Sequence, residues 1–150
     1  ANAHASYQTM LGLETLPLRM DRIISSVETI AKELSKQGLN INHPCLESHP
    51  HHERYKKDFS QGCGTLLTIY MGDKEKAFKF LDSSKLLTLT ANIGDCRTLG
   101  LHMGSTIYQD FTTKEKEFLG ITDGLIRISI GLETPQDIID DLLNCFEASK

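Results

Sequence analysis

Arg127 is the residue of this chain whose surroundings best fit the binding of an anion. It lies in residues 125–130, an expected strand in which Ile126, Ile128 and Ile130 share the face toward the core. Arg127 therefore projects from the opposite face of a stiff element, where its planar guanidinium can pair with both oxygens of a carboxylate. The same alternation also fits an arginine that faces solvent on an open sheet, and the pattern alone favours this simpler interpretation.

The turn Asn92-Ile93-Gly94-Asp95 is a second candidate for anion binding. It lies between two expected strands, and a turn of this composition can present backbone N–H groups to an anion. Asn, Gly and Asp also occur in turns for conformational reasons alone. By itself, this turn is therefore only a weak indication of a site.

A histidine-rich loop raises the question of a metal site. His43, His49, His51 and His52 lie close together in the sequence, with Cys45 and Glu47 among them. No two of the histidines have the i, i+4 spacing of zinc ligands on a helix, and prolines divide the group. A solvated loop is the favoured interpretation, and no metal is predicted.

The remaining candidates for catalysis are weaker. His102 and Tyr108 can in principle exchange protons, but such residues more often pack or cap. Cys63 lies between two glycines and would be reactive only beside a cation or a helix N-terminus, and the sequence indicates neither. No glycine-rich phosphate loop or nucleophile elbow occurs, and of the lysines only Lys85 has apolar neighbours. We therefore expect neither a catalytic nor a cofactor-binding residue in this chain.

The composition is that of one globular domain. The chain has 150 residues, of which 39% are hydrophobic and 24% charged, with a net charge of −4. The acidic balance argues against a nucleic-acid partner, and the short apolar runs argue against a membrane span. The N-terminus shows no signal peptide. Four scattered cysteines without a CxxC pair are typical of reduced thiols in a cytoplasmic protein.

Hydrophobic periodicity predicts a mixed fold. Helices are expected over residues 3–11, 14–37, 74–81, 114–117 and 136–146, and strands over residues 39–42, 65–71, 86–91, 98–102 and 125–130. The first two helices are expected to meet at an angle at Gly12. In the helix over 74–81, Ala77, Phe78 and Leu81 are expected to face inward. The order of elements predicts an α/β (α+β) fold with helices packed on one face of the sheet.

Four segments, in order along the chain, have the spacing of known motifs. Gly12–Arg22 resembles GLETLPLRMxRH, His43–Pro50 resembles YPGLxSHP, Asn92–Leu99 resembles N(L/V)GDxxTL, and Gly120–Glu133 resembles GIxxGLIRxSVGLE. Together they are similar to the Cys/Met-metabolism family of pyridoxal-phosphate enzymes. That family includes cystathionine γ-synthase, cystathionine lyases, methionine γ-lyase and O-acetylhomoserine sulfhydrylase. The Asn92 turn looks most like that of the O-acetylhomoserine sulfhydrylases.

The resemblance implies which part of a longer enzyme this chain corresponds to. The chain would be the C-terminal small domain of a type I fold enzyme, mainly an antiparallel sheet with helices on one face. Residues 1–38 would be linking helices leading out of a large domain that binds pyridoxal 5'-phosphate, and residues 39–150 the small domain. The chain lacks an initiator methionine and opens within an expected helix, so we expect a fragment.

The resemblance also implies roles for the candidate residues. Arg127 would bind the α-carboxylate of a small amino-acid substrate, and Asn92 and the Ile93 N–H would line the same pocket. The intact enzyme, a cytoplasmic homo-tetramer, would form homocysteine or methionine from an activated homoserine ester by γ-replacement. Without the Schiff-base lysine, this chain alone would not turn over.

The segment after the strand over 98–102 departs from the family pattern. The family reads HPASTTH there, and its threonine and last histidine fall on Ile107 and Tyr108. Alternative functions therefore stay open. The intact protein could be like cystathionine γ-synthase, cystathionine γ-lyase or methionine γ-lyase, or a non-catalytic paralogue that serves as an assembly module.

Overall fold

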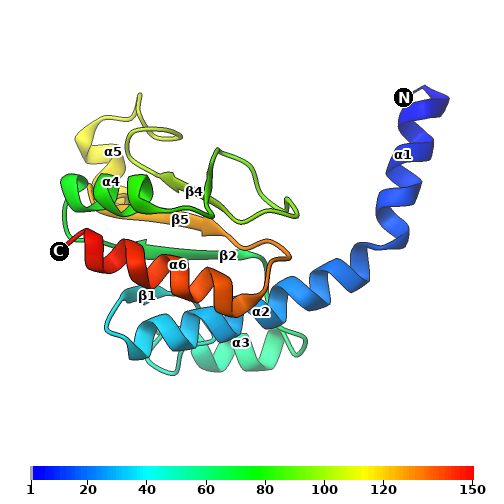
Figure 1. The fold of residues 1–150 in the computed structure, drawn as a ribbon, viewed down its shortest axis with the longest axis horizontal. Helices are drawn as coiled ribbons and strands as arrows, with labels where there is room; N and C mark the ends of the chain where they lie inside the picture. Colours follow the sequence, from blue (N-terminus) through cyan, green and yellow to red (C-terminus); the bar gives the residue numbers. More distant parts are fainter. Residues whose placement is uncertain (1) are drawn as a thin grey trace.

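The computed structural model describes residues 2–150 (Figure 1). Its helices are α1 (Ala3–Glu14), α2 (Leu16–Lys36), α3 (His52–Asp58), α4 (Lys74–Ser83), α5 (Thr113–Phe118) and α6 (Pro135–Ala148). Its strands are β1 (Asn40–Asn42), β2 (Leu66–Tyr70), β3 (Thr88–Leu89), β4 (Leu99–His102) and β5 (Leu125–Ser129). In this part of the chain, none of the helices has the length and apolar content that a membrane span requires.

The strands form one five-stranded sheet in the order β1-β2-β5-β4-β3. All neighbouring strands are antiparallel except β3 and β4. β5 is the central strand, and its middle residue, Arg127, lies opposite Thr68 of β2 and Leu101 of β4. The predicted mainly antiparallel sheet is therefore confirmed, and Arg127 is held on both sides by paired strands.

Helices α2, α4 and α6 cover one face of this sheet, as predicted. Figure 1 shows α6 running along the sheet between α2 and α4, and α6 packs against both. Ile126, Ile128 and Ile130 are fully buried beneath these helices, as their alternation predicts. Each such side chain contributes about 1.5–3 kcal/mol through burial. The core therefore fixes which face of β5 remains for Arg127.

The break between the first two helices lies at Thr15, not at Gly12 as predicted. Pro17 explains the position, because its nitrogen has no hydrogen to donate to the carbonyl of Leu13 and its ring would clash with that carbonyl. Gly12 remains inside α1. Figure 1 shows α1 leaving the rest of the molecule at an angle to α2, and no residue of α1 is buried.

The helix α3 lies within the segment that the sequence predicted to be a loop. Its seven residues are too few for an apolar stripe, so hydrophobic periodicity gives no signal. Charged side chains stabilise α3 instead. Glu53 lies in the first turn, Lys56 and Lys57 lie in the last, and Arg54 pairs with Asp58 at 3.1 Å, one turn apart.

Two further predictions are corrected by the structure. In α4 the buried residues are Ala77, Phe80 and Leu81, which share the i, i+3, i+4 stripe, whereas Phe78 is 38% exposed. The segment between β3 and β4 is a wide loop rather than a tight turn, because the two strands are parallel and the chain must return to the same end of the sheet. This loop, residues 90–98, contains Asn92.

One carboxylate ties α6 to the chain that leaves α4. Asp141 accepts hydrogen bonds from the Ser84 hydroxyl, from the Lys85 N–H at 3.0 Å and from the Leu86 N–H at 3.3 Å. These donors lie in the chain that follows the end of α4, and Asp141 itself is half-buried. The contact fixes α4 against α6 and sets the start of β3.

We expect Asp141→Ala to lower the free energy of unfolding of this chain by about 2 kcal/mol, because it removes a charged acceptor from several donors at once. Urea unfolding followed by circular dichroism measures the change. Asp140→Ala is the matched control, since Asp140 is exposed and bonds only Gln136 within the same helix. Equal losses for the two variants would contradict the role given to Asp141.

Candidate functional site

Arg127 lies half-buried on the face of β5 that the helices leave open. Its Nη2 donates a hydrogen bond to the backbone oxygen of Asn92, at 3.2 Å. Its Nε is buried and has no hydrogen-bond partner. Burial lowers the pKa of Arg127, and nearby Tyr108 partly offsets this. The guanidinium thus pays a desolvation cost that its own contacts do not fully compensate.

An anion would complete the contacts of this guanidinium. Among residues 2–150, no acidic side chain forms an ion pair with Arg127. A carboxylate that accepts hydrogen bonds from Nε and one terminal nitrogen is the usual bidentate partner of arginine. The structure therefore separates Arg127 from an ordinary solvent-facing arginine by its buried, unpartnered nitrogen.

Asn92 contacts Arg127 in the structure, and the contact is made by the backbone oxygen of Asn92 rather than by its side chain. The Asn92 side chain instead accepts a hydrogen bond from the Ile93 N–H, at 2.9 Å. The Ile93 side chain is 52% exposed. All three predicted site residues thus belong to one region of the molecule, in which Asn92 links the loop of Ile93 to β5.

Residues that sequence analysis did not single out hold this loop in place. The carboxylate of Glu133 accepts hydrogen bonds from the Thr98 N–H and hydroxyl, at 2.7 and 2.8 Å. The Ser129 hydroxyl accepts one from the Gly94 N–H, at 3.3 Å. The alternation along β5 was an available signal for Ser129, two residues after Arg127, but Glu133 lies beyond the end of the strand, where alternation gives no signal.

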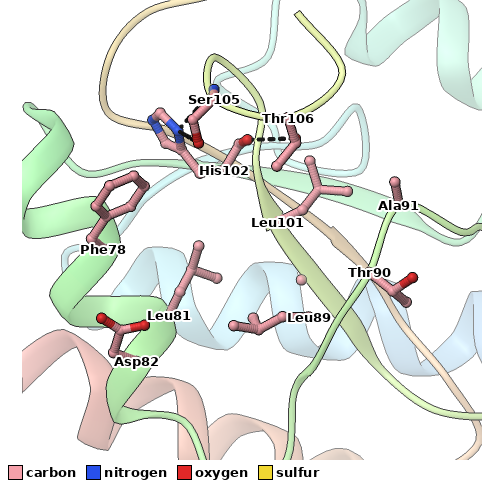
Figure 2. Close-up of a pocket in the computed structure, with 11 residues that line it drawn as sticks. Phe78, Leu81, Asp82, Leu89, Thr90, Ala91, Leu101, His102, Ser105 and Thr106 are labelled. Atoms are coloured by element: carbon pink, nitrogen blue, oxygen red, sulfur yellow. Dashed lines mark hydrogen bonds between the residues drawn. The ribbon is translucent and has the colours of Figure 1, made fainter. Parts of the chain in front are cut away.

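His102, the last residue of β4, lies at a pocket of about 300 Å³ that apolar side chains dominate (Figure 2). Its Nδ1 contacts the hydroxyl of Ser105 at 2.8 Å, and its Nε2 contacts the backbone oxygen of Asp123 at 2.7 Å. Phe78 meets the ring edge-on. Because both nitrogens of the buried ring are occupied, His102 is a packing residue here rather than a proton donor to a ligand.

The histidine-rich loop is held by its own main chain. His43 Nδ1 accepts a hydrogen bond from the Cys45 N–H at 3.2 Å, and His52 Nδ1 lies 2.9 Å from the Pro44 oxygen. Within residues 2–150, no group of three or more His, Cys, Asp or Glu side chains is arranged to hold a metal ion. Tyr55 packs between the rings of His43 and His52 and bonds Glu28. The loop thus has a structural role.

Comparison with known proteins gives the family. A model of the Cys/Met metabolism PLP-dependent enzymes matches residues 1–147. The chain belongs to this family. It is 38% identical over 141 residues to O-acetyl-L-homoserine sulfhydrylase of Leptospira meyeri, covering 91% of this chain and 32% of that protein. It is 36% identical over 139 residues to L-methionine gamma-lyase of Fusobacterium nucleatum subsp. nucleatum, covering 91% and 35%.

A solved structure agrees with this assignment. The crystal structure of a Campylobacter jejuni protein, assigned as a candidate O-acetylhomoserine (thiol)-lyase, matches with a TM-score of 0.84 and 34% identity. The match covers 91% of this chain and 33% of that one, which carries a pyridoxyl-lysine group. This chain spans about a third of the length of the curated relatives it matches. The predicted family and its cofactor, pyridoxal phosphate, are confirmed.

The described residues of this family member do not themselves fit the cofactor. A lysine that carries pyridoxal phosphate needs surroundings that keep its amine out of water. The lysines among residues 2–150 are exposed, except for Lys116, which is half-buried and donates to the Gly104 oxygen at 3.1 Å. We therefore assign none of them to the cofactor. Arg127, whose buried Nε has no hydrogen-bond partner, remains the candidate residue for binding an anion.

The buried His43 predicts a loss of stability in mild acid. Burial lowers its pKa from the ordinary 6.5, so between that lower value and pH 6.5 the unfolded chain binds a proton that the folded chain does not. The free energy of unfolding should therefore fall as the pH drops below 6.5, by at most about 1.4 kcal/mol per pH unit for this group. Protonation also removes the acceptor for the Cys45 N–H.

Urea unfolding between pH 7.5 and 5 measures this slope. His43→Asn can keep the acceptor without titrating, so it should flatten the slope. His4→Asn, at an exposed position of α1, should leave the slope as it is. An unchanged slope in His43→Asn would contradict the assignment to His43.

Proposed function

We propose that this chain supplies the substrate-carboxylate site of an O-acetylhomoserine sulfhydrylase-like enzyme. The observation that carries the proposal is the buried, unpartnered Nε of Arg127 on the central strand. A small amino-acid substrate offers a carboxylate whose two oxygens match the guanidinium fork. Relatives named O-acetyl-L-homoserine sulfhydrylase support the substrate class.

In this proposal the contribution of the chain is orientation. Arg127 binds the α-carboxylate, and Asn92 and Ile93 line the same pocket, with the Asn92 carbonyl keeping the guanidinium in place. Gripping the carboxylate fixes the direction of the neighbouring Cα–H bond, so binding energy is used to position the reacting atoms. Pyridoxal phosphate supplies the electron-withdrawing chemistry of the reaction when bound.

The rest of the intact protein belongs to the same proposal. We infer that residues 1–38 connect a cofactor-binding part, like that of the longer relatives, to the small domain formed by residues 39–150. The apolar side chains Tyr7, Met10 and Leu13 of α1 are 57–63% exposed, which supports a contact between α1 and another part of the enzyme. A cytoplasmic homo-tetramer is the assembly we propose.

Other activities of the family remain as the second candidate. A relative named L-methionine gamma-lyase is 36% identical, close to the sulfhydrylases. Homocysteine formation from O-acetylhomoserine and sulfide indicates the sulfhydrylase, and thiol release from methionine indicates a γ-lyase. Product formation from cystathionine or its precursors would indicate a cystathionine enzyme. Inactivity in all three assays would favour the non-catalytic assembly module that the changes at Ile107 and Tyr108 motivate.

In the intact enzyme, we expect Arg127→Ala to raise the KM for the amino-acid substrate by about 100-fold, because it removes a charged hydrogen-bonded partner of the carboxylate worth about 3 kcal/mol. Steady-state kinetics with varied amino acid measure this. Arg54→Ala is the control, since exposed Arg54 pairs only with Asp58 on α3. A KM that stays unchanged in Arg127→Ala would reject the proposed carboxylate site.

A further inference from the structure

We propose that Glu133 is a positioning residue for Arg127, acting through the loop of residues 90–98. The inference rests on the proposed function, because it concerns how the carboxylate site is kept in shape. It also makes a separate claim: the loop is a rigid part of the site, and Glu133 makes one of the attachments that hold it.

The first step is the dependence of Arg127 on this loop. A long arginine side chain has many rotamers, and the bond from Nη2 to the Asn92 oxygen selects one of them. Asn92 is an exposed residue of the loop, so no burial in a core holds its carbonyl in place. The position of the guanidinium therefore depends on how firmly the loop is attached elsewhere.

The second step is the attachment itself. Beyond Asn92, three hydrogen-bonding groups of the loop are held by residues after Arg127. The Gly94 N–H bonds Ser129, the Cys96 oxygen accepts from the Leu132 N–H at 2.8 Å, and Thr98 bonds Glu133. The loop thus lies along the chain that continues from β5.

Glu133 makes the shortest of these attachments. Its two oxygens accept the Thr98 N–H and the Thr98 hydroxyl separately, and the hydroxyl oxygen of Thr98 in turn accepts the Gly131 N–H at 3.0 Å. Thr98 is fully buried. Hydrogen bonds to a carboxylate are stronger than neutral ones. Within residues 2–150 Glu133 forms no ion pair with a cation, so its side chain is committed to the loop.

The third step is the close approach at Gly131. A Cβ at this position would lie 2.4 Å from the Cys96 oxygen and 2.5 Å from the Arg97 carbonyl carbon. Only glycine lets the loop lie this near the main chain. Arg127, Ser129, Gly131 and Glu133 are alternate residues. The segment that carries the guanidinium thus also carries the attachments that fix its loop.

A double-mutant cycle in the intact enzyme tests this inference. We expect Glu133→Ala to raise the KM for the amino-acid substrate about tenfold while kcat changes less, since a misplaced loop weakens the grip on the carboxylate. In an Arg127→Ala background the same substitution should have no further effect on KM, because there is no guanidinium left to position. The coupling is the readout that a general structural role would not produce.

Two companion variants guard against a folding defect. Glu133→Gln can still accept the Thr98 N–H and donate to its oxygen, so it should restore most of the wild-type KM. Thr98→Val removes only the hydroxyl and should give an intermediate KM, which keeps the test available if Glu133→Ala does not fold. Glu117→Ala, at an exposed position of α5, is the matched control and should match the wild type.

The outcomes separate the two proposals. Equal effects of Glu133→Ala with and without Arg127 would overturn the positioning role and leave the carboxylate site standing. An unchanged KM in Arg127→Ala alone would overturn the proposed function, and the positioning role with it. A tenfold rise that disappears in the Arg127→Ala background supports both.

Discussion

The structure depends on one requirement, that a partly desolvated guanidinium be held at the middle of the central strand. Arg127 has strands on both sides, a loop carbonyl at Nη2 and no partner at its buried Nε. A charge in this position is stable only if fixed dipoles or a bound anion replace the water it has lost. In the proposed function, the substrate carboxylate is the anion that replaces this water.

The two faces of β5 have different roles in meeting this requirement. The helix-covered face holds the isoleucines, whose burial fixes the strand. The other face holds Arg127 and Ser129, and the chain that continues from β5 carries Gly131 and Glu133. The contacts of Ser129, Gly131 and Glu133 hold the loop of residues 90–98. Since successive side chains of a strand point to opposite faces, stability and binding can share one short segment. This arrangement underlies the proposal that Glu133 positions Arg127 without touching it.

Sequence patterns predicted the parts of the fold that depend on local rules. The alternation at residues 125–130 gave the correct inward face of β5, and the apolar spacing gave α2 and α6 nearly to their ends. The patterns did not predict α3, whose seven residues carry no apolar stripe, or the parallel pairing of β3 with β4, which depends on the path of the loop between them. Gly12 was the wrong break because a proline five residues later has the stronger effect.

At the site, too, local sequence patterns could place a residue on its strand but could not predict contacts between residues far apart in the chain. The alternation placed Arg127 on the open face of its strand, but its proposed role came from the family resemblance, and its contact with the Asn92 carbonyl joins residues 35 positions apart. The most direct measurement is a crystal structure of the intact enzyme with an unreactive amino-acid analogue of the substrate. The account predicts both carboxylate oxygens about 2.7–3.2 Å from Nε and a terminal nitrogen of Arg127. A carboxylate bound elsewhere, with Arg127 Nε still unpartnered, would contradict it.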